Sequence, residues 1–345
     1  MSFNRWSQGL DASAEAVITA RPTEALWSEN FLFALQDPLS GLALWLHLGT
    51  VPTDWHLWED RIYAWLPGGS GLLSLSSYHA TRPEDRPGGA VMRFACIEPF
   101  RRWRVVLDGF ALHSEVSTMD RGDGPSRRRR LRLELEVDCA SPVWDARRGN
   151  GHGYAGMAAQ AWAKEHYEQL VRARGWMEVD GQRLEVDATG WRDHSRGPRG
   201  SKNKDPWGGH VIGGCLFDDG RGFLFSRYWR PDGTVNLSGG MVVDASGDRH
   251  DAEVVEAPCL ERLLLQGEEL PICLRWKGGT LNVTLRTESS IWIPRERKHQ
   301  VGRDLHGALG DMYVLNWGPV TWGQKTAITY LERSAHLNAL PARIA

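Results

Sequence analysis

The stretch Ala188-Thr-Gly-Trp-Arg-Asp-His-Ser-Arg-Gly-Pro-Arg199 lies near the middle of a chain of 345 residues. Its last nine residues combine an aromatic ring, three arginines, a carboxylate, an imidazole and a hydroxyl. It follows an Asp-Gly hairpin signal, and the sequence on both sides has the pattern of β-strands. We therefore expect this polar stretch to form a strand.

An extended backbone would divide the stretch into two sets of side chains, because successive residues of a strand point to opposite faces of the sheet. One set is Trp191, Asp193 and Ser195, and the other is Arg192, His194 and Arg196. Only one set can line a ligand cavity.

Alternation of apolar and polar residues predicts strands on both sides of this stretch. Residues 131–138 alternate between aliphatic and charged side chains, and residues 42–49 place Trp45 and His47 on one face. Asp108-Gly109 and Asp180-Gly181 are dipeptides that favour type I′ hairpins. Many short strands with such turns and little helix indicate an all-β fold, with antiparallel sheets closed as barrels or packed as sandwiches.

The length of the chain exceeds one ordinary hydrophobic core, which favours two domains or one large β-assembly. Residues 145–160 interrupt the β pattern and predict a boundary, with a short helix continuing through Gln169. The expected organisation is therefore an N-terminal arm over 1–26, a β-domain over 27–160, and a second β-domain over 161–345 that carries the Arg-Asp-His-Ser motif.

Composition excludes several classes of function. A net charge of −2 and a pI near 6.6 argue against a nucleic-acid partner. No apolar run approaches the ~20 residues of a membrane helix, so no integral membrane segment is expected. Five widely spaced cysteines and the lack of a secretion signal pattern predict reduced thiols and a cytoplasmic location. The sequence makes no prediction of oligomeric state.

Cofactor motifs are also missing from the sequence. The run Gly151–Gly156 matches G-x-G-x-x-G, but no strand leads into its first glycine, as a dinucleotide site requires. No histidine lies at metal-ligand spacing from a cluster of carboxylates or thiols. We expect neither a cofactor nor a metal.

Tryptophan is abundant, with 17 copies. Such enrichment suits an aromatic-lined cavity for a bulky apolar ligand, or a β-rich core that uses tryptophan as filler. A carboxylate at Asp193 beside Trp191 would have a raised pKa and could donate a proton. If the other face lines the cavity, His194 between arginines would act as a base. The alternative is structural, because Arg–Asp pairs commonly tie two sheets together.

Three segments resemble a known family, namely His166–Gln169, Gly175–Gly181 and Gly190–Arg199. They are similar to the carotenoid hydratase (hydroxyneurosporene synthase) superfamily and its bacterial relatives, whose hallmark is G-x-R-D-H-S-W-G-P-R. The superfamily includes lipocalin-like hydratases and is akin in fold to decalin-forming cyclases. Arg196 replaces the usual tryptophan, which predicts a more polar or differently shaped wall.

The resemblance implies two tandem lipocalin-like β-barrel domains and cofactor-free addition or removal of water on a bulky, small-molecule hydrophobic substrate of isoprenoid, terpenoid or steroid type. Asp193 is the expected proton donor, with His194 as its partner or base. The expected substrate-binding residues are Arg192 and Arg196 for an anionic or carbonyl group, Tyr167 and Glu168 in support, and Trp191, Trp207 and Tyr228 as the wall. A polyene isomerase or cyclase, and a non-catalytic carrier of hydrophobic ligands, are the alternatives.

Overall fold

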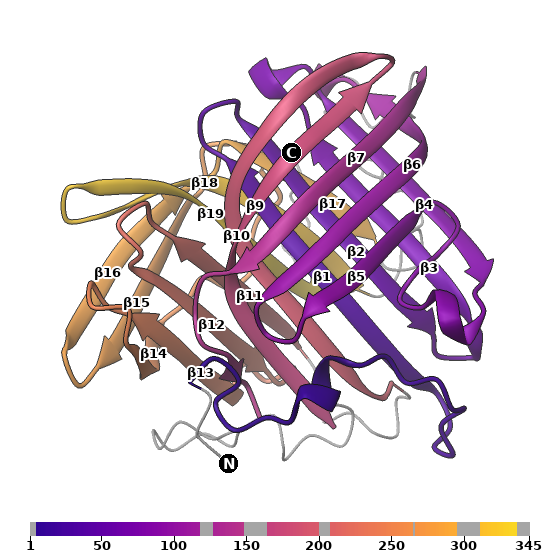
Figure 1. Ribbon diagram of the computed structural model, residues 1–345. Coiled ribbons are helices and arrows are strands. Elements are labelled where there is room, and N and C mark those ends of the chain that lie inside the picture. Colours follow the sequence, from indigo (N-terminus) through magenta and orange to yellow (C-terminus); the bar gives the residue numbers. More distant parts are fainter. Residues whose placement is uncertain are drawn as a thin grey trace.

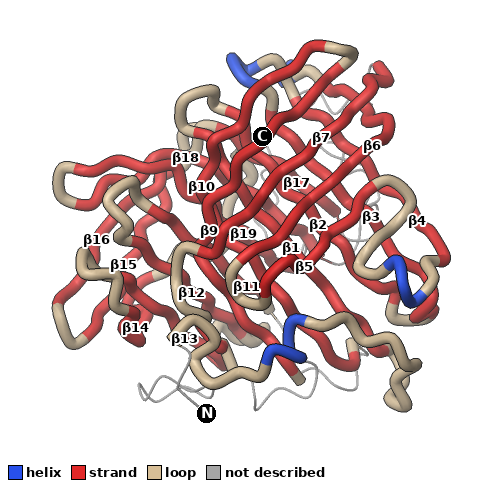
Figure 2. Tube along the Cα trace, in the orientation of Figure 1, coloured by secondary structure: helices blue, strands red, loops and turns tan. Residues whose placement is uncertain are grey.

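The computed structural model describes residues 5–117, 127–147, 164–199, 208–264, 266–294 and 311–336. Most of them belong to two curled antiparallel sheets, which lie side by side in Figure 1. Figure 2 shows only short helical turns among the described residues, including the 3-10 turns η1 (Ala12–Glu15), η2 (Pro67–Gly69) and η3 (Pro83–Asp85). The predicted all-β fold with two lipocalin-like β-barrel domains is confirmed.

The first sheet has ten strands. They are β1 (Trp27–Asp37), β2 (Leu42–Val51), β3 (Asp54–Trp65), β4 (Leu72–Ala80), β5 (Met92–Glu98), β6 (Arg102–Ser114), β7 (Arg127–Cys139), β8 (Trp144–Asp145), β9 (Glu165–Val179) and β10 (Gln182–Pro198). Their order is β10-β1-β2-β3-β4-β6-β7-β9, and β9 also pairs with β10, which closes eight strands into a barrel. β5 adds to β6, and β8 adds to β9.

Side chains fill the interior of this barrel. The alternation predicted for residues 131–138 is confirmed, since Leu131, Leu133, Leu135 and Val137 are buried in the interior cluster. The strands β1 and β2 and the second half of β10 are buried on both faces, because the second sheet covers the outside of the barrel there. The barrel core is therefore packed, and a ligand space must be sought elsewhere.

The second sheet has nine strands. They are β11 (Gly209–Leu216), β12 (Gly222–Trp229), β13 (Val235–Val243), β14 (Arg249–Glu256), β15 (Glu269–Trp276), β16 (Gly279–Arg286), β17 (Ser289–Pro294), β18 (Asp311–Trp322) and β19 (Lys325–His336). Their order is β16-β15-β14-β13-β12-β11-β19-β18-β17. One apolar cluster lies on one face of this curled sheet. A second apolar cluster lies between its other face and the outside of the barrel.

The change from one sheet to the other does not coincide with the boundary expected at residue 160. β9 and β10 pair with β7 and β1 of the barrel, so the first sheet continues to Pro198. The Arg-Asp-His-Ser motif therefore lies in the first barrel, where it pairs with residues more than 150 positions earlier in the sequence. Residues 165–169 form the start of β9 and not a helix.

The two hairpin predictions had different outcomes. Asp180-Gly181 connects β9 to β10, and both residues have positive φ, as a type I′ turn requires. The prediction for Asp108-Gly109 was wrong, because both residues lie inside β6. Asp108 pairs with Arg132 and Gly109 with Leu131 of β7, so the strand continues through both residues.

Two glycines allow the barrel to close around β9 and β10. A Cβ atom on Gly190 would lie 1.9 Å from the Ala34 carbonyl oxygen, and one on Gly175 would lie 2.0 Å from that of Glu134. Any larger residue would push the neighbouring strand away. No described helix is both long and apolar enough to span a bilayer.

Candidate active site

A cavity of about 390 Å³ lies between the outer face of the barrel and the second sheet. Its lining is aromatic and aliphatic in the middle and carries polar groups from both walls. The barrel contributes Ser28, Asn30, Leu32, Trp45, His47, Thr50, Val51, Pro52, Glu59, Arg61, Tyr78, His166, Glu168, Trp191, Asp193, Ser195 and Arg199. The second sheet contributes His210, Ile212, Tyr228, Asn236, Leu237, Ile293, Tyr313, Leu315 and Glu332.

One row of paired residues crosses the barrel wall of the cavity. Arg61 of β3 pairs with His47 of β2, which pairs with Leu32 of β1. Leu32 pairs with Asp193 of β10, which pairs with Glu168 of β9. Paired residues point to the same face of a sheet, so all five side chains face the second sheet. Strand pairing thus brings residues from positions 32 to 193 into one line.

The acidic end of this row contains a buried histidine between two carboxylates. His166 Nε2 lies 3.0 Å from Asp193 Oδ1 and 3.2 Å from Glu168 Oε1. Glu168 is fully buried, and its Oε2 atom has no hydrogen-bond partner among the described residues. Nδ1 of His166 likewise has none. These two atoms can interact with a molecule in the cavity.

The electrostatics of the three groups separate their pKa values. Burial raises the pKa of Asp193, but the charge of His166 outweighs burial and brings the pKa below its usual value. Burial lowers the pKa of His166, yet the Asp193 and Glu168 carboxylates raise it to about 10. Burial raises the pKa of Glu168 to about 7. The favoured state is therefore an Asp193–His166 ion pair beside a Glu168 that can carry a proton.

This arrangement changes the expected role of Asp193. Its side chain lines the cavity, as the hypothesis required, but the adjacent imidazolium keeps it ionised. Glu168, expected only in support, has the better properties for a proton donor. The physical reason is that one imidazolium stabilises the first carboxylate charge, while a second charge in the same buried space costs more.

The same three residues form the one described group whose donor atoms lie within 4.8 Å of one another, a spacing that could hold a cation. The sequence did not reveal this cluster, because strand pairing brings Asp193 to the other two. His166 Nε2 already contacts both carboxylates through its proton. A cation bound at this place would have to displace that proton. The expectation of no metal stays a prediction.

The opposite wall presents a second histidine–carboxylate pair. His210 Nε2 lies 3.0 Å from Glu332 Oε1, and its Nδ1 lies 2.5 Å from Ser334 Oγ. The ring stacks on Tyr228 at 5.1 Å and meets Tyr313 edge-on at 5.7 Å. Glu332 lines the same cavity as Glu168, and its charge adds to the effect of burial in raising the pKa of Glu168.

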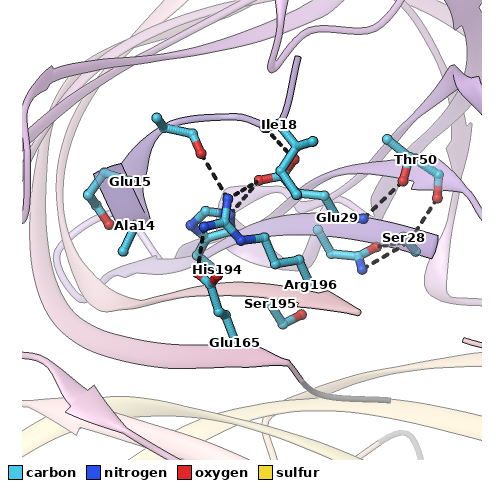
Figure 3. A network of polar contacts seen from close by, with 12 residues as sticks. Ala14, Glu15, Ile18, Ser28, Glu29, Thr50, Glu165, His194, Ser195 and Arg196 are labelled. Carbon is cyan, nitrogen blue, oxygen red and sulfur yellow. Dashed lines mark hydrogen bonds and ion pairs between the residues drawn. The ribbon is translucent and has the colours of Figure 1, made fainter. Parts of the chain in front are cut away.

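The other triplet of the motif points into the barrel. Arg192 Nη2 lies 2.8 Å from Glu15 Oε1 of the N-terminal arm. His194 is held on both sides, with Nδ1 2.6 Å from the Tyr167 hydroxyl and Nε2 2.9 Å from Glu29 Oε1. All these groups are buried in one network of polar contacts. Figure 3 shows Glu15, Glu29 and His194 close to one another, beside the segment of the arm that carries Glu15.

Arg196 completes this network. Figure 3 shows it pointing toward Glu29, which its Nη1 approaches to 3.3 Å, while its Nη2 lies 2.5 Å from Glu165 Oε2. Arg192, His194 and Arg196 do not line this cavity, because they pair with carboxylates inside the barrel. Their expected action on a substrate stays a prediction. Tyr167 belongs to the same network and does not line the cavity either.

Of the other predicted site residues, Trp191, Glu168 and Tyr228 line the cavity with Asp193. Trp207 lies outside the described residues. Sequence reasoning missed His166, although it stands two residues before Glu168 and thus shares its face of the strand. It also missed Arg199, whose Nη2 donates to Ser195 Oγ at 3.0 Å.

The remaining missed groups, His210 and Glu332, could not be found from the sequence. They are more than 120 residues apart and meet only because β11 pairs with β19.

Comparisons with known proteins agree with this architecture. A family model described as "Domain of unknown function (DUF7064)" matches residues 14–258. No curated protein matches the sequence. A crystal structure from Nitrosomonas europaea, of a protein proposed to be an AttH, is similar at 14% identity and a TM-score of 0.54, over 93% of this chain and 100% of that one.

The crystal structure of CghA with Sch210972 is similar at 12% identity and a TM-score of 0.52, over 90% of this chain and 88% of that one. Kievitone hydratase from Nectria haematococca has 10% identity and a TM-score of 0.47, with the same shares of the two chains. At these identities the first two show a common fold alone. Whether the chain is a carotenoid hydratase stays a prediction.

Proposed function

The chain belongs to the DUF7064 family, and from the geometry of its cavity we propose that it is a hydratase or dehydratase that works without a cofactor. The proposed substrate is a bulky isoprenoid, terpenoid or steroid-like molecule. The observation that carries this proposal is Glu168, a fully buried carboxyl group that lines the cavity and has one oxygen without a hydrogen-bond partner among the described residues.

Hydration of a substituted alkene needs a proton donor to carbon, a stabilised cation and a water molecule that loses a proton. Glu168 is suited to the first step because its pKa of about 7 keeps it partly protonated near neutral pH. The C=C π electrons take this proton, and a carbocation forms on the neighbouring carbon. General acid catalysis of this kind contributes roughly 10²- to 10⁴-fold to the rate.

Aromatic rings beside the acid can stabilise the cation. Trp191 shares the face of β10 with Asp193, and Tyr228 lies on the opposite wall. A desolvated cation over such a ring gains about 2 kcal/mol. The apolar lining, including Leu32, Leu237 and Leu315, suits a hydrocarbon body and limits the access of bulk water.

The ion pair beside Glu168 supplies the remaining proton steps. Water adds its oxygen to the cation and loses a proton to the Asp193 carboxylate. His166 Nε2 contacts both carboxylates, so it can donate a proton to Glu168 and recover one from Asp193. Each turnover would then return all three groups to their starting state, and the reverse sequence would remove water.

Identification of the bound molecule is the first step of the test. Native mass spectrometry and solvent extraction of the purified protein give its natural ligand, which is then incubated with the protein in D₂O. A hydratase adds one molecule of D₂O across the double bond and so places one deuterium on carbon. A dehydratase removes one molecule of water and places no deuterium on the reacting carbons. Glu168→Gln should lose this activity by roughly 10²-fold or more, whereas Glu185→Gln, at an exposed position of β10, should retain it.

Other outcomes would support the alternatives. Cyclisation or isomerisation without exchange of water would indicate a cyclase or isomerase. A ligand that is recovered unchanged under all conditions would indicate a carrier.

A further inference from the structure

The far end of the cross-strand row carries a second charged group that the proposed reaction does not use. The Arg61 side chain is 14% exposed and lines the cavity. Its Nη2 lies 2.5 Å from Glu59 Oε2, and the Tyr78 hydroxyl donates to Glu59 Oε1 at 2.8 Å. The Nε–H of Arg61 is buried and has no hydrogen-bond partner among the described residues. The Arg61 guanidinium therefore lines the cavity and keeps an N–H donor that no described residue accepts from.

The position of Arg61 relative to the acid is fixed by strand pairing. Arg61 is three strands away from Asp193 along one row, through His47 and Leu32. At about 4.8 Å between neighbouring strands, the two backbone positions are roughly 14 Å apart along the sheet. His47 and Leu32 lie between them in the row, and the ring of Trp45, which also lines the cavity, stacks on His47 at 5.3 Å. The row thus has a cationic end, a middle formed by an imidazole and an aliphatic side chain, and an acid–base end.

We infer that Arg61 binds an acidic oxygen group of the substrate, a carboxylate or an enolate, at the end of the molecule remote from the reacting double bond. The substrate class is thereby narrowed from a hydrocarbon to an amphipathic acid. The assignment of the reacting end rests on the proposed function, whereas binding at Arg61 does not.

The geometry of the guanidinium favours this ligand. Arginine presents its donors as a planar fork that matches two oxygens of a carboxylate. Arg192 pairs with Glu15, and Arg196 pairs with two carboxylates, Glu29 and Glu165, so neither of them lines the cavity. Arg61 instead pairs with one carboxylate and lines the cavity, and its buried Nε–H has no hydrogen-bond partner among the described residues.

Glu59 provides a second test of the inference, because its carboxylate would compete with the ligand for the Arg61 guanidinium. If Arg61 holds a ligand anion, Glu59→Gln removes a nearby negative charge and should strengthen binding of the anion. If the Glu59–Arg61 pair only supports the fold, this substitution should leave ligand binding unchanged.

A matched pair of probes tests the inference without the natural substrate. The probes are 11-(dansylamino)undecanoic acid and its methyl ester, titrated against the full chain by fluorescence. The unmodified protein should bind the acid about tenfold tighter than the ester, and Arg61→Met should abolish the difference by weakening the acid alone. Glu59→Gln should increase the preference severalfold.

Controls separate recognition from folding. Arg174→Met removes an exposed arginine of β9 that pairs with Asp187, and it should change neither titration. Arg61→Lys keeps the positive charge but loses the planar fork of donors, and it should retain part of the preference for the acid over the ester. This variant keeps the test possible if Arg61→Met is unstable. Equal binding of acid and ester by the unmodified protein, or an unchanged preference in Arg61→Met, would overturn the inference.

The outcome is independent of turnover, because both titrations measure binding. A protein that prefers the acid through Arg61 but shows no defect in Glu168→Gln turnover would overturn only the proposed function. A protein with the expected Glu168 defect and no acid preference would overturn only the inference about Arg61.

Discussion

His166 Nε2 lies 3.0 Å from Asp193 Oδ1, across the paired strands β9 and β10 and at the wall of the cavity between the sheets. This ion pair determines which of the three titratable groups of the site are charged. It keeps Asp193 ionised and leaves Glu168, 3.2 Å from the same nitrogen, as the group that exchanges a proton near neutral pH. The chemistry of the site is thus a property of three residues and not of the motif alone.

Turnover should depend on pH through Glu168. Its pKa is about 7, so the donor form predominates below pH 7 and declines above it. We expect kcat for hydration to be level between pH 5.5 and 6.5 and to fall about tenfold per pH unit well above pH 7. A rate profile with the natural ligand measures this. A limb that rises through pH 7 would instead identify an essential base.

Stability should decrease as the pH rises from 6.5 to 10, because of His166. Its pKa is raised from 6.5 in the unfolded chain to about 10 in the folded protein. A raised pKa stabilises the folded state fully below pH 6.5, and this contribution is lost as the pH passes 10. Urea unfolding across this range should show a shallower pH dependence in His166→Gln. His79→Gln, on the exposed end of β4, is the control and should behave like the unmodified protein.

Arg192 should be essential for stability, not directly for chemistry. Arg192→Met leaves Glu15 buried in the barrel without its cationic partner, and breaking such a pair costs about 3–5 kcal/mol. The double variant with Glu15→Gln should recover a large part of this loss, since no unpaired charge remains. Urea unfolding of both variants measures the difference. If the double variant is no more stable than Arg192→Met, the ion pair is not what the barrel requires.

Trp191 should act through its aromatic face. It is buried beside Tyr330, with ring centroids 5.7 Å apart, and it lines the cavity. Loss of a cation–π contact of about 2 kcal/mol corresponds to roughly 30-fold in rate. We expect Trp191→Leu to lower kcat by that order and Trp191→Phe to lower it much less. An equal loss in both variants, measured by steady-state kinetics after verification of folding, would indicate a role in shape alone.

Much of the fold could be predicted from the sequence, because strand alternation is a local property of the backbone. The pattern at residues 131–138 identified both that strand and its inward face, and Asp180-Gly181 identified the turn between β9 and β10. The same rule divided the motif correctly into an Asp193 face and a His194 face. The failure at Asp108-Gly109 has a tertiary cause, since the pairing of β6 with β7 runs through both residues.

The sequence by itself therefore determined that the chain is all-β and that Asp193 and His194 face opposite ways. Only the tertiary structure decided that the Asp193 face lines a cavity outside the barrel, and that Glu15 and Glu29 neutralise the other face inside it. Only pairing of β9 with β10 placed His166 and Glu168 against Asp193. The physical reason is that alternation depends on neighbouring residues, whereas the pKa values and the cavity depend on strands that meet from distant parts of the chain.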